Sequence, residues 1–150
     1  MGRMYAAIVD AISVSAVQDI LEIVAPATAI VVLHEVHVTQ DASETSEQLP
    51  FQIHRASTSG SGGAALTPVL LDLGSTAFGG TCERNNTSRG TEGDILWRQS
   101  ENILNGLHIV FTPESRPIVP PSGRIVVGLE SAPGAALTLS AVAIFEEIGT

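Results

Sequence analysis

The segment "HEVH" contains the first residues whose types and spacing could do chemistry. His34, Glu35 and His37 offer two imidazoles and a carboxylate, which are donor types that bind Zn²⁺. The zinc-protease motif needs histidines four residues apart on a helix, whereas these two are three apart. On a regular strand, positions three apart face opposite sides of the sheet. The spacing therefore predicts no metal site, and His54 and His108 show no spacing that would add one.

The glycine-rich run "TSGSGG" at 58–63 is a second candidate, for a phosphate site or a serine nucleophile. A phosphate-binding loop of the Walker type needs a lysine after its glycines, and this chain contains no lysine. The run also lacks the G-x-S-x-G pattern of a nucleophile elbow. Cys82 is the single cysteine and has no histidine close in sequence, so we expect an inert thiol. We predict no catalytic residues, metal or cofactor.

Composition and charge indicate which partners to expect. Charged residues make up 15% of the chain, against roughly 25% in an average soluble domain. Apolar residues make up 44%, yet no apolar run approaches the ~20 residues that span a membrane. The net charge is −9 and the basic residues are scattered arginines, which argues against nucleic acid. The excess of apolar residues predicts surfaces buried against other protein subunits.

Alternation of apolar and polar residues predicts strands along the chain. The segments with this pattern are 48–55, 94–99, 107–111, 124–130 and 136–147, and 29–40 is valine-rich on both faces, as expected for a central strand. Pro133 and Gly134 predict a turn that joins the last two segments as a terminal hairpin. The first 24 residues allow either two strands or an amphipathic helix, and their Val and Ile content favours strands.

These elements predict one all-β domain over residues 1–150. We expect an antiparallel β-sandwich or jelly roll of about eight strands, because no strand–helix–strand alternation is present. Two long loops, 56–68 and 74–92, interrupt the pattern. Loops of this length in a compact domain are usually functional or disordered, and we expect neighbouring subunits to hold them in place.

A series of segments gives the chain a family resemblance. They are "SAVQDILEIVAP" (15–26), "HRASTSGSGGAALTP" (54–68), "NNT" (85–87), "FTPESRP" (111–117) and "SAPGAALTLSAVAIFEE" (131–147). In this order they resemble small virion structural proteins of tailed bacteriophages and prophages. The resemblance implies a β-sandwich head decoration, or cement, protein that binds the outside of the major capsid protein lattice as a homotrimer. It carries no catalytic residues.

The resemblance and the composition together lead to specific expectations. We expect synthesis in the host cytoplasm, since Asp10 interrupts the apolar core that a signal peptide needs, and a final location on the capsid exterior. The candidate interface residues are Leu66, Phe78, Arg84, Arg89 and Trp97; Trp97 could instead belong to the core. A head spike, fibre-base or tail-associated display protein is the alternative, and a cupin-like ligand- or metal-binding protein is a third class.

Overall fold

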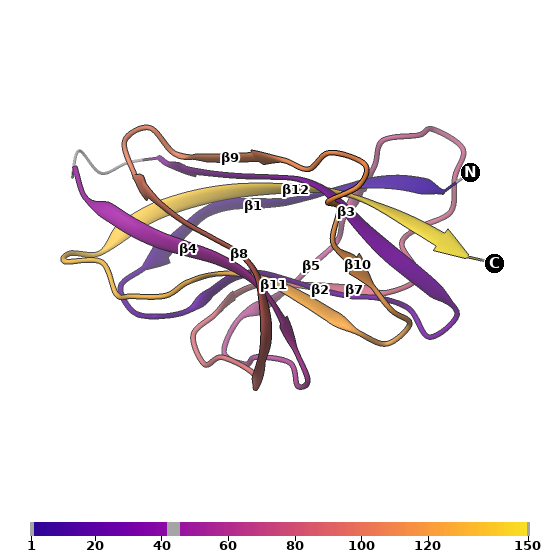
Figure 1. The fold of residues 1–150 in the computed structure, drawn as a ribbon, viewed down its shortest axis with the longest axis horizontal. Helices are drawn as coiled ribbons and strands as arrows, with labels where there is room; N and C mark the ends of the chain where they lie inside the picture. The colour runs from indigo at the N-terminus through magenta and orange to yellow at the C-terminus, as the bar shows by residue number, and fades with distance from the viewer. Residues whose placement is uncertain (1, 42–45, 150) are drawn as a thin grey trace.

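The computed structural model describes residues 2–41 and 46–149, which form two antiparallel sheets packed face to face (Figure 1). These residues contain no helix, so the prediction of an all-β sandwich is confirmed. Sheet A has the strand order β10-β3-β12-β1-β6, and β9 also pairs with β3. Sheet B has the order β5-β7-β2-β11-β4-β8.

The strands of sheet A are β1 (Arg3–Val14), β3 (Ala29–Gln40), β6 (Val69–Leu70), β9 (Leu107–Val110), β10 (Ile118–Val119) and β12 (Leu137–Gly149). The strands of sheet B are β2 (Asp19–Val24), β4 (Gln48–Ala56), β5 (Ala64–Leu66), β7 (Thr81–Asn86), β8 (Glu92–Asn102) and β11 (Arg124–Leu129). Residues 2–41 and 46–149 therefore form twelve strands rather than about eight.

One hydrophobic core lies between the two sheets. Its members come from alternate positions of the strands, as the apolar period of two predicts. From β12 it receives Leu137, Leu139 and Phe145, and from β4 it receives Leu49 and Phe51, all essentially inaccessible to solvent. Burial of a large apolar side chain contributes roughly 1.5–3 kcal/mol, so this core is the main source of the stability of the fold.

The N-terminal segment forms two strands, and the helical alternative is wrong. β1 pairs with β12 in sheet A, whereas β2 lies between β7 and β11 in sheet B. Val and Ile are stiff at χ1 and suit a pleated strand better than a helix. The pairing of β1 shifts register between Val9 and Ile12, where Ala11 has a φ of 46°.

The predicted terminal hairpin is also wrong. β11 lies between β2 and β4 in sheet B, while β12 lies between β1 and β3 in sheet A. The turn at Pro133 and Gly134 therefore belongs to a connection that crosses from one sheet to the other. Alternation shows which side chains face the core, but it is the same for a strand in either sheet, so it could not assign the partner strand.

The two predicted long loops are shorter than expected, because each contains a strand. β7 lies inside 74–92 and pairs with both β2 and β5, and β5 lies inside 56–68. β7 has the sequence TCERNN, which is poor in the β-branched and aromatic residues typical of strands. Its place in the sheet depends on β2, a neighbour far away in sequence.

Candidate functional site

The outer face of sheet B is polar, and the loops of the same chain cover it. Glu22, Gln52 and His54 point to this side and are nevertheless buried. The backbone N–H of Gly60 donates to Glu22 Oε2 at 3.0 Å, and Arg124 Nε donates to Ser59 Oγ at 2.8 Å. The glycine-rich run is thus held by its own domain. The expectation that neighbouring subunits also hold this loop stays a prediction.

A buried ion-pair network fastens the second loop to the same face. Arg89 Nε lies 3.1 Å from Asp19 Oδ1, and the guanidinium also contacts Glu92 and the carbonyl oxygen of Leu129. Asp19 is almost fully buried, so it needs a cationic partner. Arg89, which we predicted as an interface residue, makes these pairs within the chain.

His54 completes this network. Its Nδ1 lies 3.0 Å from the carbonyl oxygen of Arg55, and its Nε2 faces Asp19 at 3.8 Å and Glu92 at 3.9 Å. Burial lowers the pKa of His54, but Asp19, the Arg55 carbonyl and Glu92 together outweigh burial and leave the pKa raised above 6.5. The charged imidazolium is therefore favoured in the folded protein.

The outer face of sheet A is different, because many of its side chains are apolar. The strand registers place a set of apolar side chains on this side, opposite the core. We call this set the apolar outer face: Met4, Ala6, Ile8, Ile30, Val32, Val69, Val110, Ile118, Val142, Ile144 and Ile148. A solvated face of an antiparallel sheet normally carries polar residues at these alternate positions.

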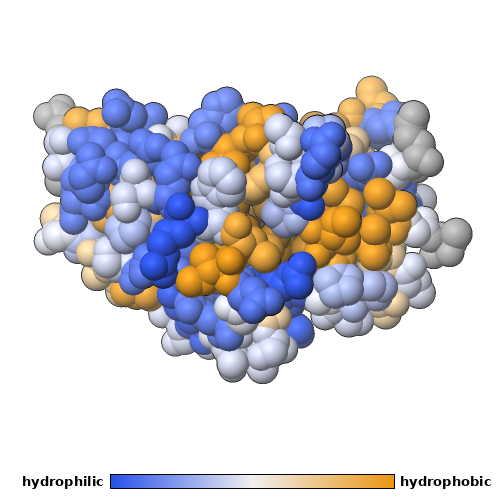
Figure 2. Space-filling view, viewed as in Figure 1, coloured by the Kyte–Doolittle hydropathy of each residue, from blue (hydrophilic) through white to orange (hydrophobic). Residues whose placement is uncertain are grey.

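Several of these side chains are open to solvent. The exposed fraction is 59% for Val110, 54% for Val69, 51% for Ile118 and 47% for Ile8. In the view of Figure 2, apolar surface gathers over the region where β3 and β10 run in Figure 1. An exposed apolar surface with polar residues around it is typical of a protein–protein contact.

The two histidines of the segment "HEVH", His34 and His37, lie on this same outer side of sheet A. The register between β3 and β12 shifts at His34, so that Leu33 pairs with Phe145 but Glu35 pairs with Ile144. This bulge places His34 on the same side of the sheet as Glu35 and His37. Regular alternation predicts that His34 and His37 face opposite sides, and that prediction is wrong. His34 Nε2 lies 3.2 Å from Glu146 Oε2, away from the other two.

Glu35 and His37 lie beside His108, which no spacing along the chain connects with them. His37 pairs across the strands with His108 of β9, and their rings stack with centroids 3.9 Å apart. His37 Nε2 also lies 3.1 Å from Glu35 Oε2. The local sequence shows only that positions 35 and 37 share a face of a strand. The pairing of β3 with β9 joins segments that lie far apart in the chain.

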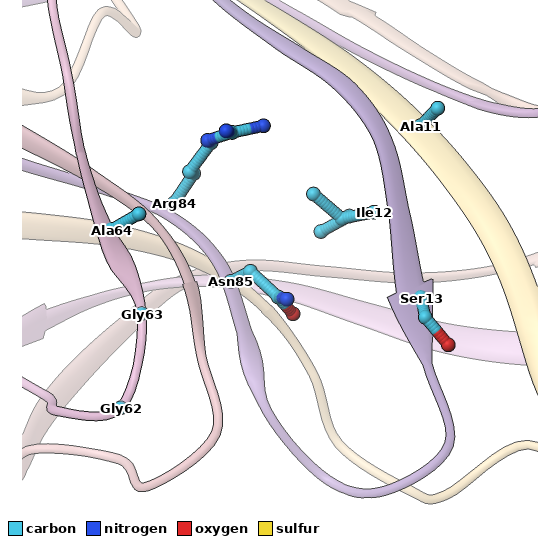
Figure 3. Close-up of a pocket in the computed structure, with 8 residues that line it drawn as sticks. All are labelled: Ala11, Ile12, Ser13, Gly62, Gly63, Ala64, Arg84 and Asn85. Atoms are coloured by element: carbon cyan, nitrogen blue, oxygen red, sulfur yellow. The ribbon is translucent and has the colours of Figure 1, made fainter.

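A pocket of about 360 Å³ opens between β1 and the β5–β7 side of sheet B (Figure 3). Eight residues line it: Ala11, Ile12, Ser13, Gly62, Gly63, Ala64, Arg84 and Asn85. The side chains of Ile12 and Arg84 point into the space between the strands. Arg84 is the one titratable side chain in this lining, so the pocket contains no acid–base pair for catalysis.

The remaining predicted interface residues lie in three places. Leu66 and Phe78 line a second hollow of about 230 Å³, and both pack partly against the core. Arg84 lies in the pocket of Figure 3. Trp97 is 39% exposed on β8, the edge strand of sheet B, and contacts Phe111 edge to face at 5.7 Å. The structure does not bring the five predicted residues into one surface, and their role at an interface stays a prediction.

The strand patterns in the sequence did not reveal the apolar outer face, because apolar residues at these positions also fit an ordinary central strand. Val and Ile on both faces of 29–40 indicated a central strand, and β3 is one. The same pattern also indicates that both faces of the strand are covered. Ile144 and Ile148 repeat it in the last strand, which is the signal that could have identified the surface.

Cys82 is not part of this surface. Its thiol is buried in the core, and burial together with the Glu22 carboxylate raises the pKa of Cys82 to about 12. The thiol is therefore protonated at neutral pH and unreactive.

Comparisons with protein-family models, with curated proteins and with solved structures found no match for this chain. Within residues 2–41 and 46–149, no helix has the length and hydrophobicity needed to cross a membrane.

Proposed function

We propose that this chain is a structural assembly protein of a tailed-bacteriophage virion, a capsid decoration protein that binds the outside of the major capsid protein lattice as a homotrimer. The apolar outer face of sheet A carries this proposal. It supplies the kind of surface that an assembly protein buries, and the segment resemblance described above supplies the setting.

The contrast between the two sheets supports an assembly role. The chain covers the outer face of sheet B with its own loops, where Arg89 pairs with Asp19 and the Gly60 N–H donates to Glu22. On sheet A, Ile8, Val110 and Ile118 stay open to water. Exposed apolar area costs free energy in proportion to its size. Burial against further copies of the chain or against a protein shell removes that cost.

Multivalency explains how such a surface could stabilise a particle. Each subunit contributes a modest contact, but a trimer that spans several capsid subunits gains from high effective concentration. The net charge of −9 is compatible with the capsid exterior, away from packaged DNA. Trp97 and the edge strand β8 offer a separate contact on the opposite sheet.

The first test concerns self-association. Light scattering of the purified protein is expected to give the mass of a trimer, and Ile8→Glu is expected to shift it to a monomer. Ile8 lies in the apolar outer face, whereas Leu104 is comparably exposed but lies in a turn outside both sheets. Leu104→Glu is therefore the matched control and should stay trimeric. A wild-type protein that remains monomeric at high concentration contradicts the homotrimer.

The second test concerns the particle. A map of virions that contain this protein is expected to show its density repeated over the capsid lattice, and particles without it should lose DNA at a lower temperature. Density confined to one vertex or to the tail would instead identify a spike or tail component. Unchanged thermal stability of the depleted particles would also contradict a cement role.

A further inference from the structure

Three potential metal-binding side chains meet on the outer side of sheet A. We propose that Glu35, His37 and His108 form a binding site for a divalent transition-metal ion of the Zn²⁺ type. This inference goes beyond the assembly role and does not depend on it.

The geometry brings together one ligand atom from each residue. A carboxylate oxygen of Glu35 and a ring nitrogen of each histidine all lie within 4.8 Å of one another. Glu35 and His37 are two positions apart on β3 and share a face. His108 is the direct cross-strand neighbour of His37, and such neighbours have Cβ atoms roughly 5 Å apart.

The donor set fits a borderline divalent cation. Two imidazoles and one carboxylate are the three protein ligands of many zinc sites, in which water or a further ligand takes the fourth position. Imidazole suits Zn²⁺, Cu²⁺ and Ni²⁺, whereas Mg²⁺ and Ca²⁺ prefer oxygen ligands. The acidic balance of the chain also favours the approach of a cation.

Only a small rearrangement is needed for coordination. Bonds of about 2.0–2.1 Å in a tetrahedral site place ligand atoms closer together than 4.8 Å, so they must approach by on the order of 1 Å. Glu35 and His37 are about one-third exposed and His108 is exposed. Rotation of their side chains therefore requires no change in the packing of the core.

His34 is a built-in comparison for this site. It belongs to the same strand and has the same side chain, but it lies beside Glu146 and is not part of the cluster. A site that depends on the cluster must therefore lose affinity when His37 or His108 is replaced and keep it when His34 is replaced. Non-specific binding to surface histidines would not distinguish the three.

The test is calorimetric titration of the tag-free, chelator-treated protein with Zn²⁺ alone. The wild type is expected to bind one ion per chain. His108→Ala and His37→Ala are expected to weaken binding at least about tenfold, because even the loss of a residue that only hydrogen-bonds a metal ligand costs roughly 10–100-fold. His34→Ala should bind as the wild type does. Thermal denaturation without metal checks that each variant is folded.

Two NMR readouts make the assignment specific. Addition of Zn²⁺ is expected to shift the imidazole signals of His37 and His108 and to leave those of His34 in place. The proposal is overturned if the wild type shows no binding, if His34→Ala weakens binding as much as His108→Ala, or if the His34 signals shift with the others.

Discussion

Nε2 of His54 lies 3.8 Å from Oδ1 of Asp19, and both side chains are only 1% exposed. Asp19 belongs to β2 and His54 to β4, the strands on either side of β11. Both side chains lie on the outer side of sheet B, beneath the loop that contains Arg89. A buried carboxylate is costly without a cationic partner. This network therefore shows how the chain encloses a polar sheet face, and it leads to the first two predictions.

Replacement of Arg89 by methionine is expected to destabilise the fold by roughly 3 kcal/mol, because Asp19 would remain buried without its closest cation. Arg98→Met is the matched control. The Arg98 pair with Glu130 is 2.6 Å long but half-exposed, and such surface pairs contribute at most about 1 kcal/mol. Urea denaturation measures both variants, and equal losses would contradict the role given to the buried network.

The stability contributed by His54 is expected to decrease as the pH rises. Its pKa is raised in the folded protein, so protonation favours folding. The contribution is complete below the ordinary histidine pKa of about 6.5 and is lost as the pH passes through the higher folded value. The difference in unfolding free energy between the wild type and His54→Gln should therefore be larger at pH 6 than at pH 9. A difference that grows with pH would contradict the raised pKa.

Gly63→Ala is expected to destabilise the protein by about 1–3 kcal/mol, the usual cost of overpacking. A Cβ atom at this position would overlap the carbonyl oxygen of Arg84, which is backbone and cannot rotate away. Gly134→Ala is the control, because its nearest neighbour, Glu47 Oε1, would lie at an ordinary 3.5 Å. Thermal denaturation that ranks the two variants in the opposite order would show that the glycine-rich run is loosely held.

Cys82 is expected to resist thiol reagents while the protein is folded. Its thiol is buried and its pKa is raised to about 12, so the reactive thiolate is scarce at pH 8. Labelling with a chromogenic disulfide should be slow in buffer and fast in urea, which exposes the thiol. Fast labelling of the folded protein would mean that the strand around Cys82 opens readily.

Much of the fold is evident from local patterns. The alternation of Leu137, Leu139 and Phe145 with polar residues predicts a strand with one face in the core, and the structure confirms it. The charge-poor composition predicts more apolar surface than one core can hold, and Ile8 and Val110 are where it lies. The alternation is visible within a single strand, because the side-chain period of a strand is two.

The partner of each strand cannot be predicted from such local patterns. The pairing of β11 with β4, the place of β7 in sheet B and the bulge at His34 depend on contacts between distant segments. The same holds for the cluster of Glu35 and His37 with His108, since no spacing along the chain reports the register of β3 against β9. Alternation decides which way a side chain points, whereas long-range hydrogen bonding decides which side chain it meets.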